Sequence, residues 1–339
     1  MNIPGPEIIN PAAVPSLRWG VIGPGGIANA FVSATKKHTT QQISAVASRT
    51  AGRAAKFAAD HEIANVHENY QQLVEDDNLD AIYIASWQVE HFEHAMLALN
   101  AGKHVLIEKP ITVLPEHAEQ IFNLAAEMGV LAMEAMWTRY LPQSTIIRKL
   151  LAEGDLGAPQ LFTGTFAVDN RHIERLWAKG GGGIVYDMGI YPIAMAQQFM
   201  GNPSSVAASG SVDENGMDQE SFAVLDYDHG GRSLVTTSGI ATVPTTASCS
   251  FENGVVVVDE PFFVPSGIRL RDKELYFEEQ TWSDQTPVRG HEGLSYQATW
   301  FAKYVAEGRN DSEVHNAADT VANIRTAQEI TAQLGATPI

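Results

Sequence analysis

The sequence predicts an α/β protein, with an N-terminal Rossmann-type doubly wound parallel sheet and a C-terminal α+β domain built on an open, mostly antiparallel sheet. Between residues 18 and 133, short apolar runs alternate with helical segments of about 10 to 15 residues, the pattern of βαβ units. From about residue 160, strand-like runs follow one another with turn signals such as Asn253-Gly254 between them. This second pattern favours antiparallel pairing.

Each element is predicted from apolar periodicity and from the residues that end it. In the first domain we expect strands at 18–22, 43–47, 81–85, 104–107 and 130–133, helices at 27–37, 51–60, 91–100 and 115–128, and a helical turn at 70–74. In the second we expect helices at 146–152, 184–199, 294–306 and 317–334, and strands at 160–168, 205–210, 221–227, 233–238, 247–251 and 254–258.

These elements set three predicted segments. Residues 1–16 form an extended arm, because their prolines resist helix formation. Residues 17–140 form the dinucleotide-binding Rossmann domain, and residues 141–339 form a domain for substrate binding and oligomerisation. We expect the last helix to pack back on the first domain.

The composition narrows the possible partners. The chain has 339 residues and a net charge of −18, which repels nucleic acid phosphates and anionic membranes, so we expect neither as a partner. Cys249 is the only cysteine, so no intrachain disulfide forms, and this favours a reducing, cytoplasmic location. We expect no metal site, although His91 and His94 are spaced for weak chelation on one helix.

A glycine-rich turn follows the first predicted strand. Gly23, Gly25 and Ala28 fit the pattern G-x-G-x-x-A at the start of a helix, which is the context that the dinucleotide-binding fingerprint requires. The amides of Gly26 and Ile27 lie at the helix N-terminus, where they can bind a pyrophosphate. The alternative is a glycine turn without a ligand.

The end of the second predicted strand favours NADP over NAD. An NAD-binding domain usually carries an acid there for the ribose 2′-hydroxyl, whereas this strand ends in Ser48 and Arg49, with Arg53 close behind. A hydroxyl and two arginines suit a 2′-phosphate. NAD remains possible, because both arginines can also be ordinary solvated residues at a helix start.

Two further motifs carry a family resemblance. Glu108-Lys109-Pro110 follows the fourth strand, and residues 181–192 read G-G-G-I-V-Y-D-M-G-I-Y-P. With the glycine turn, they resemble the glucose-fructose oxidoreductase / inositol dehydrogenase / MocA family, and most closely its dimeric dihydrodiol dehydrogenase / D-xylose dehydrogenase (NADP) branch. The segment 133–142, M-E-A-M-W-T-R-Y-L-P, is also similar to that branch.

The resemblance implies an enzyme that oxidises or reduces a polyol, sugar or cyclic diol, and a homodimer or higher homo-oligomer formed through the open sheet. It also implies cofactor contacts at Ser86, Trp87, His91, Glu108 and Lys109. The family commonly has T-P-N-x-x-H where this chain has Ser86-Trp87-Gln88-Val89-Glu90-His91, so the nicotinamide-ribose contacts differ, and Trp87 can form an aromatic wall of the pocket.

The same motifs supply the candidate catalytic groups. Tyr191 is the candidate acid/base, Lys109 the cation that lowers the tyrosine pKa, and Asp187, four residues before Tyr191, an orienting carboxylate on the same helix face. Trp137, Arg139 and Trp177 are weaker substrate-binding candidates, because aromatic and guanidinium groups suit sugars. Without the resemblance, each of these residues would more often be a packing or surface residue.

Two alternatives to a dehydrogenase remain. A glycosidase or lyase that retains its cofactor would use transient oxidation and form product without net change in NADPH. A non-catalytic sensor would bind NADP and turn over nothing, but it would not need Lys109, Asp187 and Tyr191 together.

Overall fold

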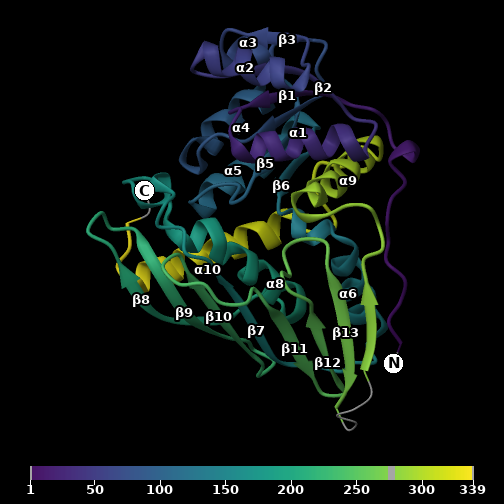
Figure 1. Ribbon diagram of the computed structural model, residues 1–339, viewed down its shortest axis with the longest axis vertical. Coiled ribbons are helices and arrows are strands. Elements are labelled where there is room, and N and C mark those ends of the chain that lie inside the picture. Colours follow the sequence, from purple (N-terminus) through teal and green to yellow (C-terminus); the bar gives the residue numbers. More distant parts are fainter. Residues whose placement is uncertain (1, 274–278, 338–339) are drawn as a thin grey trace. The chain divides into compact units, whose positions relative to one another are not determined.

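The computed structural model describes residues 2–273 and 279–337 (Figure 1), so the predicted domain limits at 1 and 339 lie outside the described residues. The chain forms two compact units. The parallel-sheet unit comprises residues 8–140 and 288–321, and the rest of the described chain forms the antiparallel-sheet unit.

The parallel-sheet unit contains a six-stranded sheet in the order β3-β2-β1-β4-β5-β6, with every described pairing parallel. Its strands are β1 Arg18–Ile22, β2 Gln42–Ala47, β3 Asn65–His67, β4 Ala81–Ile84, β5 His104–Glu108 and β6 Ala132–Ala135. The connecting helices are α1 Gly26–His38, α2 Ala51–His61, α3 Tyr70–Val74, α4 His91–Asn100 and α5 Pro115–Met128, followed by the short η3 turn Trp137–Tyr140. The strand order reverses between β1 and β4, which is where such sheets place their ligands.

Aromatic packing ties a C-terminal helix to this sheet. The ring of Trp19 on β1 lies 5.9 Å from Phe31 on α1 and 4.7 Å from Phe301 on α9, measured between ring centroids. Helix α9, Leu294–Ala306, therefore belongs to the core of the parallel-sheet unit although it is far away in sequence.

The antiparallel-sheet unit contains an eight-stranded sheet in the order β14-β13-β12-β11-β7-β10-β9-β8. The strands are β7 Pro159–Ala167, β8 Ser205–Val212, β9 Asp218–Asp226, β10 Arg232–Ser238, β11 Ala247–Phe251, β12 Gly254–Val258, β13 Gly267–Asp272 and β14 Glu279–Ser283. Only the β7–β10 pair is parallel among the pairings described. The predicted fold class is confirmed for both units.

Helices cover one face of this sheet and leave the other open. Helix α8, Ile190–Met200, is buried along its whole length against β7 and β10, and α6, Pro142–Glu153, packs beside it (Figure 1). Alternate residues of the strands point away from α8, and on that side Leu161, Phe222 and Leu234 are more than 40% exposed.

Several elements differ from the sequence prediction. Strands β3, β13 and β14 were not predicted. β3 is short and β14 is largely exposed, whereas β13 was missed although Ile268 and Leu270 alternate with arginines. Within the predicted arm, Pro11–Ala13 forms a short 3₁₀ turn. The last helix, α10 Ala317–Leu334, was expected to pack on the first domain, but its residues from 322 onward belong to the antiparallel-sheet unit.

The contacts of α10 explain its assignment. The Gln333 side chain accepts a hydrogen bond from the amide of Ala208 at 2.8 Å and donates one to the carbonyl of Val206 at 2.9 Å, both on the edge strand β8. The helix thus binds the exposed backbone of a strand that would otherwise lack partners on that side.

Two further observations concern the chain as a whole. Cys249 on β11 is fully buried, and this burial raises the pKa of its thiol. None of the helices among the described residues combines the length and the apolar character needed to cross a membrane.

Candidate active site

The glycine-rich turn after β1 has the geometry that its sequence predicts. Gly23 has φ +80°, and a Cβ there would lie 2.6 Å from the amide nitrogen of Ser86, so this position requires glycine. The amide of Gly25 donates to the Gly23 carbonyl at 2.8 Å, and Gly25 is the N-cap of α1. Ala28 is fully buried where α1 packs on the sheet.

The start of α1 fits a dinucleotide phosphate. Gly25 and Gly26 are exposed, Gly25 provides no side-chain cap, and the first turn contains no acidic residue. The first amides of a helix have no intrahelical acceptor, and the helix dipole favours an anion there. Gly25, Gly26 and Ile27 are therefore the residues whose backbone would hold the phosphates.

The end of β2 places a hydroxyl and two arginines on the same loop. Ser48 is buried, and its Oγ accepts a hydrogen bond from the Thr50 amide at 3.2 Å. Arg49 is exposed and pairs with Glu90, while Arg53 is exposed on the first turn of α2. Exposed ion pairs contribute little to stability, so a dinucleotide phosphate can compete with Glu90 for Arg49.

The loop after β4 joins the turn after β5 through a buried histidine. His91 Nδ1 lies 2.9 Å from the Pro110 carbonyl oxygen, and Nε2 lies 3.1 Å from the Ser86 carbonyl oxygen. Burial lowers the pKa of His91 to about 4, so the ring is neutral at pH 7 and donates through one nitrogen. The predicted cofactor contact at His91 thus lies between two protein carbonyls and donates a hydrogen bond to one of them, whereas Trp87 is 51% exposed.

The Glu108-Lys109 turn follows β5. The Glu108 carboxyl is buried, accepts a hydrogen bond from the Tyr83 hydroxyl at 2.6 Å and lies 3.2 Å from the Lys109 amide. Burial raises the pKa of Glu108 to about 7. Glu108 therefore fixes the backbone of the turn, while the half-buried Lys109 side chain supplies the positive charge.

Lys109 has aromatic neighbours in the parallel-sheet unit. Burial and, after it, the charge of Lys109 lower the pKa of His291. The His291 ring stacks on Trp137 with centroids 5.6 Å apart. Trp137, one of the weaker substrate candidates, is only 1% exposed, and its ring partner His291 lies near Lys109.

A second buried acid supports the same turn and was not found from the sequence. Glu134 on β6 accepts hydrogen bonds from the Ile111 amide at 2.8 Å and from His315 at 2.7 Å. Arg139, predicted as a weak substrate contact, is buried and donates to the Val314 carbonyl at 3.0 Å, beside His315. A glutamate inside an apolar strand was the sequence signal for this cluster.

Asp187 and Tyr191 lie in the antiparallel-sheet unit. We expected one α-helix from Ile184, but residues Val185–Gly189 form a π-helical turn, labelled η4, that leads into α8. Such turns are frequent at functional sites. Asp187 lies 3.5 Å from the guanidinium of Arg175, and Tyr191 is 7% exposed, with its ring 5.6 Å from Phe166 and 5.7 Å from Phe263.

The remaining substrate candidate, Trp177, lines a cavity of about 460 Å³ in the antiparallel-sheet unit. Its indole nitrogen donates to the Asn170 carbonyl at 3.0 Å, and Arg171 and Glu174 line the same cavity. Arg171 is engaged with Asp169, whose pKa its guanidinium lowers to about 2. The indole face is thus presented among charged groups.

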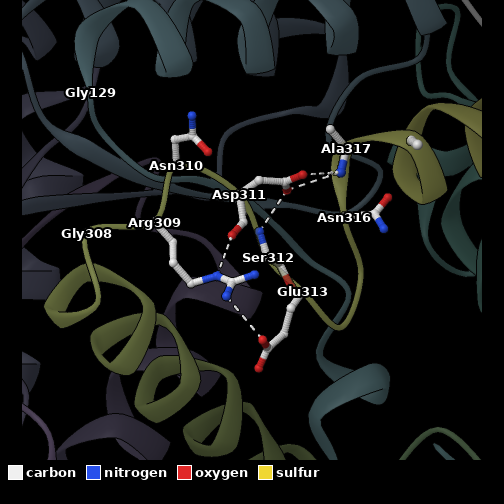
Figure 2. Close-up of a pocket in the computed structure, with 10 residues that line it drawn as sticks. Gly129, Gly308, Arg309, Asn310, Asp311, Ser312, Glu313, Asn316 and Ala317 are labelled. Atoms are coloured by element: carbon white, nitrogen blue, oxygen red, sulfur yellow. Dashed lines mark hydrogen bonds and ion pairs between the residues drawn. The ribbon is translucent and has the colours of Figure 1, made fainter. Parts of the chain in front are cut away.

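A larger cavity, about 690 Å³, lies at the start of α10 in the parallel-sheet unit. Figure 2 shows the Asp311 carboxylate directed at the Ala317 amide, with Oδ2 at 2.9 Å, and at the Ser312 amide at 2.7 Å. Arg309 donates to the Asp311 carbonyl and pairs with Glu313 at 3.1 Å. Because its charged groups satisfy one another, this cavity gives no reason to assign a ligand.

Family models match both parts of the chain. Residues 17–136 match an oxidoreductase family with an NAD-binding Rossmann fold, and residues 145–258 match the GFO/IDH/MocA C-terminal domain. The chain therefore belongs to the GFO/IDH/MocA oxidoreductase family. It is an oxidoreductase whose Rossmann domain takes a nicotinamide dinucleotide.

Among its relatives, the chain is 30% identical over 305 residues to trans-1,2-dihydrobenzene-1,2-diol dehydrogenase of Macaca fascicularis, covering 88% of this chain and 91% of the relative. It is 29% identical to scyllo-inositol 2-dehydrogenase (NADP(+)) IolU of Bacillus subtilis, with 94% and 97% covered. A solved structure of a mutant of KijD10, a 3-ketoreductase of Actinomadura kijaniata, in complex with TDP-benzene and NADP, is similar with 25% identity and a TM-score of 0.79, covering 94% of this chain and 98% of that chain. These relatives support the predicted dihydrodiol dehydrogenase branch.

Proposed function

We propose that this protein is an NADP-dependent dehydrogenase or reductase that moves a hydride between nicotinamide and a hydroxyl or carbonyl carbon of a sugar or cyclic diol. The observation that carries the choice of NADP is the end of β2, where Ser48, Arg49 and Arg53 stand and the loop itself contains no acid for a ribose 2′-hydroxyl. The relatives named for NADP use agree with this choice.

Tyr191 is the proposed acid/base. When bound, the nicotinamide ring accepts or gives the hydride, so the protein has only to move the hydroxyl proton. During oxidation, the Tyr191 phenolate accepts that proton; during reduction, the phenol returns it to the developing alkoxide. A tyrosine has an ordinary pKa of about 10, so its phenolate needs a cation near neutral pH, and Lys109 is the proposed source.

The surroundings of the two residues support these roles separately. Glu108 and Glu134 hold the backbone on both sides of Lys109, which limits the positions that its ammonium can take. The rings of Phe166 and Phe263 enclose Tyr191 and exclude water from the phenol. Asp187 is proposed to orient substrate hydroxyls, with Arg175 balancing its charge.

Binding and turnover test the proposal. The purified protein is titrated with NADP⁺ and NAD⁺ while tryptophan fluorescence is followed, and trans-1,2-dihydrobenzene-1,2-diol, scyllo-inositol and D-xylose are then supplied while absorbance at about 340 nm is recorded. We expect NADP⁺ to bind more tightly and one substrate to give new absorbance. Product without net absorbance change would indicate transient oxidation, and binding without any product would indicate a sensor.

Two substitutions test the residue roles. Lys109→Met and Tyr191→Phe should each lower kcat by about 100-fold or more, the usual effect of removing an acid/base or its activating charge. The double variant should be little worse than either single one, because the two groups act on the same proton. Lys56→Met on the exposed face of α2 and Tyr227→Phe, a buried tyrosine bound to Ser233, are the matched controls.

We also propose a cytoplasmic homodimer formed through the open face of the antiparallel sheet. On that face, three neighbouring strands each expose one large apolar side chain, namely Leu161, Phe222 and Leu234, which a second copy of the chain would remove from water. Light scattering after gel filtration should give twice the mass of the chain, and Phe222→Lys should give the monomer mass. A monomeric wild type would exclude this interface.

A further inference from the structure

The helical segment that carries Asp187 begins without a cap of its own. Ile184 is the N-cap of η4 and has no side-chain acceptor, and the three preceding residues are glycines. The first amides of a helix lack intrahelical acceptors, so burying them is costly unless another group accepts their hydrogen bonds. Ile184 and Val185 are both fully buried, so water does not serve as that group.

The missing acceptor is the carboxylate of Asp218, the first residue of β9. Asp218 is fully buried, and its Oδ2 accepts hydrogen bonds from the Ile184 amide at 2.9 Å and from the Val185 amide at 2.7 Å. A charged acceptor for backbone amides makes short and strong hydrogen bonds. The cap thus comes from a strand more than 30 residues further along the chain.

The glycine directly before Ile184 leaves space for this carboxylate. Gly183 has φ +70°, and a Cβ at Gly183 would lie 2.0 Å from Asp218 Oδ1. Both facts exclude a side chain at this position. The third glycine of the G-G-G motif is therefore explained by Asp218, and the motif and the acid form one structural unit.

We propose that Asp218 is a positioning residue of the reaction: it anchors the start of η4 and so fixes the side chains of Asp187 and Tyr191, an inference that rests on the roles proposed for those two residues. Asp187 lies two residues after the anchored Val185 amide, and Tyr191 lies one further helical turn along. Displacing a reacting group by about 1 Å can lower a rate by about 100-fold.

The charge of Asp218 decides the strength of the anchor. Burial raises its pKa to about 6, the amides of Val185 and Ile184 oppose that rise, and the charge of Asp213 adds to it. Tyr186, the other titratable group near this carboxyl, has its pKa raised to about 12 by burial and remains neutral. At pH 7 Asp218 is therefore ionised, and below about pH 6 it becomes a weaker, protonated acceptor.

The anchor can be tested with Asp218→Asn, which keeps one acceptor oxygen, and Asp218→Leu, which keeps none. We expect kcat to fall by about tenfold in the asparagine variant and by about 100-fold in the leucine variant, with an unchanged Kd for NADP⁺, because the cofactor phosphates bind the other unit. In the wild type, kcat for carbonyl reduction, which uses protonated Tyr191, should decline as the pH falls through about 6, and this decline should be absent from Asp218→Asn.

Hydrogen exchange gives a readout that needs no substrate. In the wild type the Ile184 and Val185 amides should be protected, and both Asp218 variants should exchange faster in a peptide covering 181–191. Gly183→Ala would place a methyl group against the Asp218 carboxylate, so it should disturb the same hydrogen bonds and also lower kcat. Asp226→Asn is the matched control, since this acid lies at the other end of β9 in an exposed pair with Arg232.

The outcomes separate this inference from the proposed function. If Tyr191→Phe and Lys109→Met lose activity while both Asp218 variants keep wild-type kcat and amide protection, the anchor is wrong and the proposed mechanism stands. If Tyr191→Phe retains activity, the proposed mechanism fails, and exchange at Ile184 and Val185 still decides whether Asp218 anchors η4.

Discussion

The chain contains two glycine-rich turns that each lead into a helix, and the two helix starts differ in whether a protein carboxylate binds their first amides. At α1, Gly25 and Gly26 are exposed and no acidic side chain occupies the first turn. At η4, the carboxylate of Asp218 binds the first amides and is buried with them. The first amides of α1 can therefore bind an external anion, whereas those of η4 already bind a carboxylate of the protein.

The comparison teaches that glycines before a helix do not by themselves make an anion site. A third helix start, which has no glycine before it, also has its own carboxylate, because Asp311 binds the Ala317 amide at the beginning of α10. Unlike η4 and α10, α1 has no side-chain hydrogen bond at its cap and no acidic residue in its first turn. Substitutions at the start of α1, at the loop after β2 and at the start of η4 test this comparison.

The largest expected effect comes from Gly23→Ala, which should break the α1 turn. Its φ of +80° and the 2.6 Å approach to Ser86 should lower the free energy of unfolding by about 3 kcal/mol and abolish measurable NADP⁺ binding. Denaturant unfolding and fluorescence titration measure both. Gly26→Ala is the control, since a Cβ there meets no atom within 4 Å, and it should keep or raise stability.

Gly25→Asp should give α1 the carboxylate that η4 already has. A Cβ at Gly25 has room, with its nearest contact at 3.9 Å, and aspartate is a good N-cap. We expect stability to rise by about 0.5–1 kcal/mol and the Kd for NADP⁺ to rise by about 100-fold, because the carboxylate repels the phosphates. Gly25→Asn should stabilise similarly with a smaller loss of binding; equal losses for both would contradict the electrostatic explanation.

A smaller effect is expected at the side chain that would contact the 2′-phosphate. Arg49→Ala should raise the Kd for NADP⁺ by about tenfold and leave that for NAD⁺ unchanged, since only NADP⁺ carries the 2′-phosphate. Isothermal titration of both cofactors measures the difference. Lys56→Ala, another exposed cation on the neighbouring helix α2, should change neither value, and a parallel loss for NAD⁺ at Arg49 would refute the assignment.

A further prediction concerns the pH dependence of stability at η4. Because the folded-state pKa of Asp218 is raised from 3.8 to about 6, the folded protein binds the proton more tightly than the unfolded chain. Wild-type stability relative to Asp218→Asn should therefore fall as the pH rises from about 4 to about 6 and then level off. A flat difference across that range would mean that Asp218 is already ionised at pH 4.

The strands and helices of the parallel sheet were predicted closely because apolar runs and terminal glycines mark them locally. Two of the misplaced strand ends, at β6 and β9, lie next to buried acids. The predicted strand 130–133 stops before Glu134, and the predicted strand 221–227 begins after Asp218, whereas β6 and β9 include these acids. Both acids are buried, and their partners lie far away in sequence, at His315 and at Ile184 and Val185.

The same distinction between local motifs and long-range hydrogen bonds applies to the residues of the candidate site. The motif residues Gly23, Lys109, Asp187 and Tyr191 were identified as candidates from spacing and resemblance, because each belongs to a short motif that is contiguous in the sequence. The groups that hold them, Glu134 and Asp218, were missed, because the residues they bind lie far away in sequence. Whether the motif residues act as proposed is the question that the Lys109 and Tyr191 variants answer.

The buried thiol of Cys249 has a practical consequence. Cys249 is the only cysteine of the chain, and burial suppresses the ionisation of its thiol. Maleimide and iodoacetamide should therefore not react with the native protein. A cysteine introduced at an exposed position in each unit would then be labelled selectively without first removing a native one. Fluorophores attached in this way would report, in single molecules, how the separation of the two sheets changes when a dinucleotide binds.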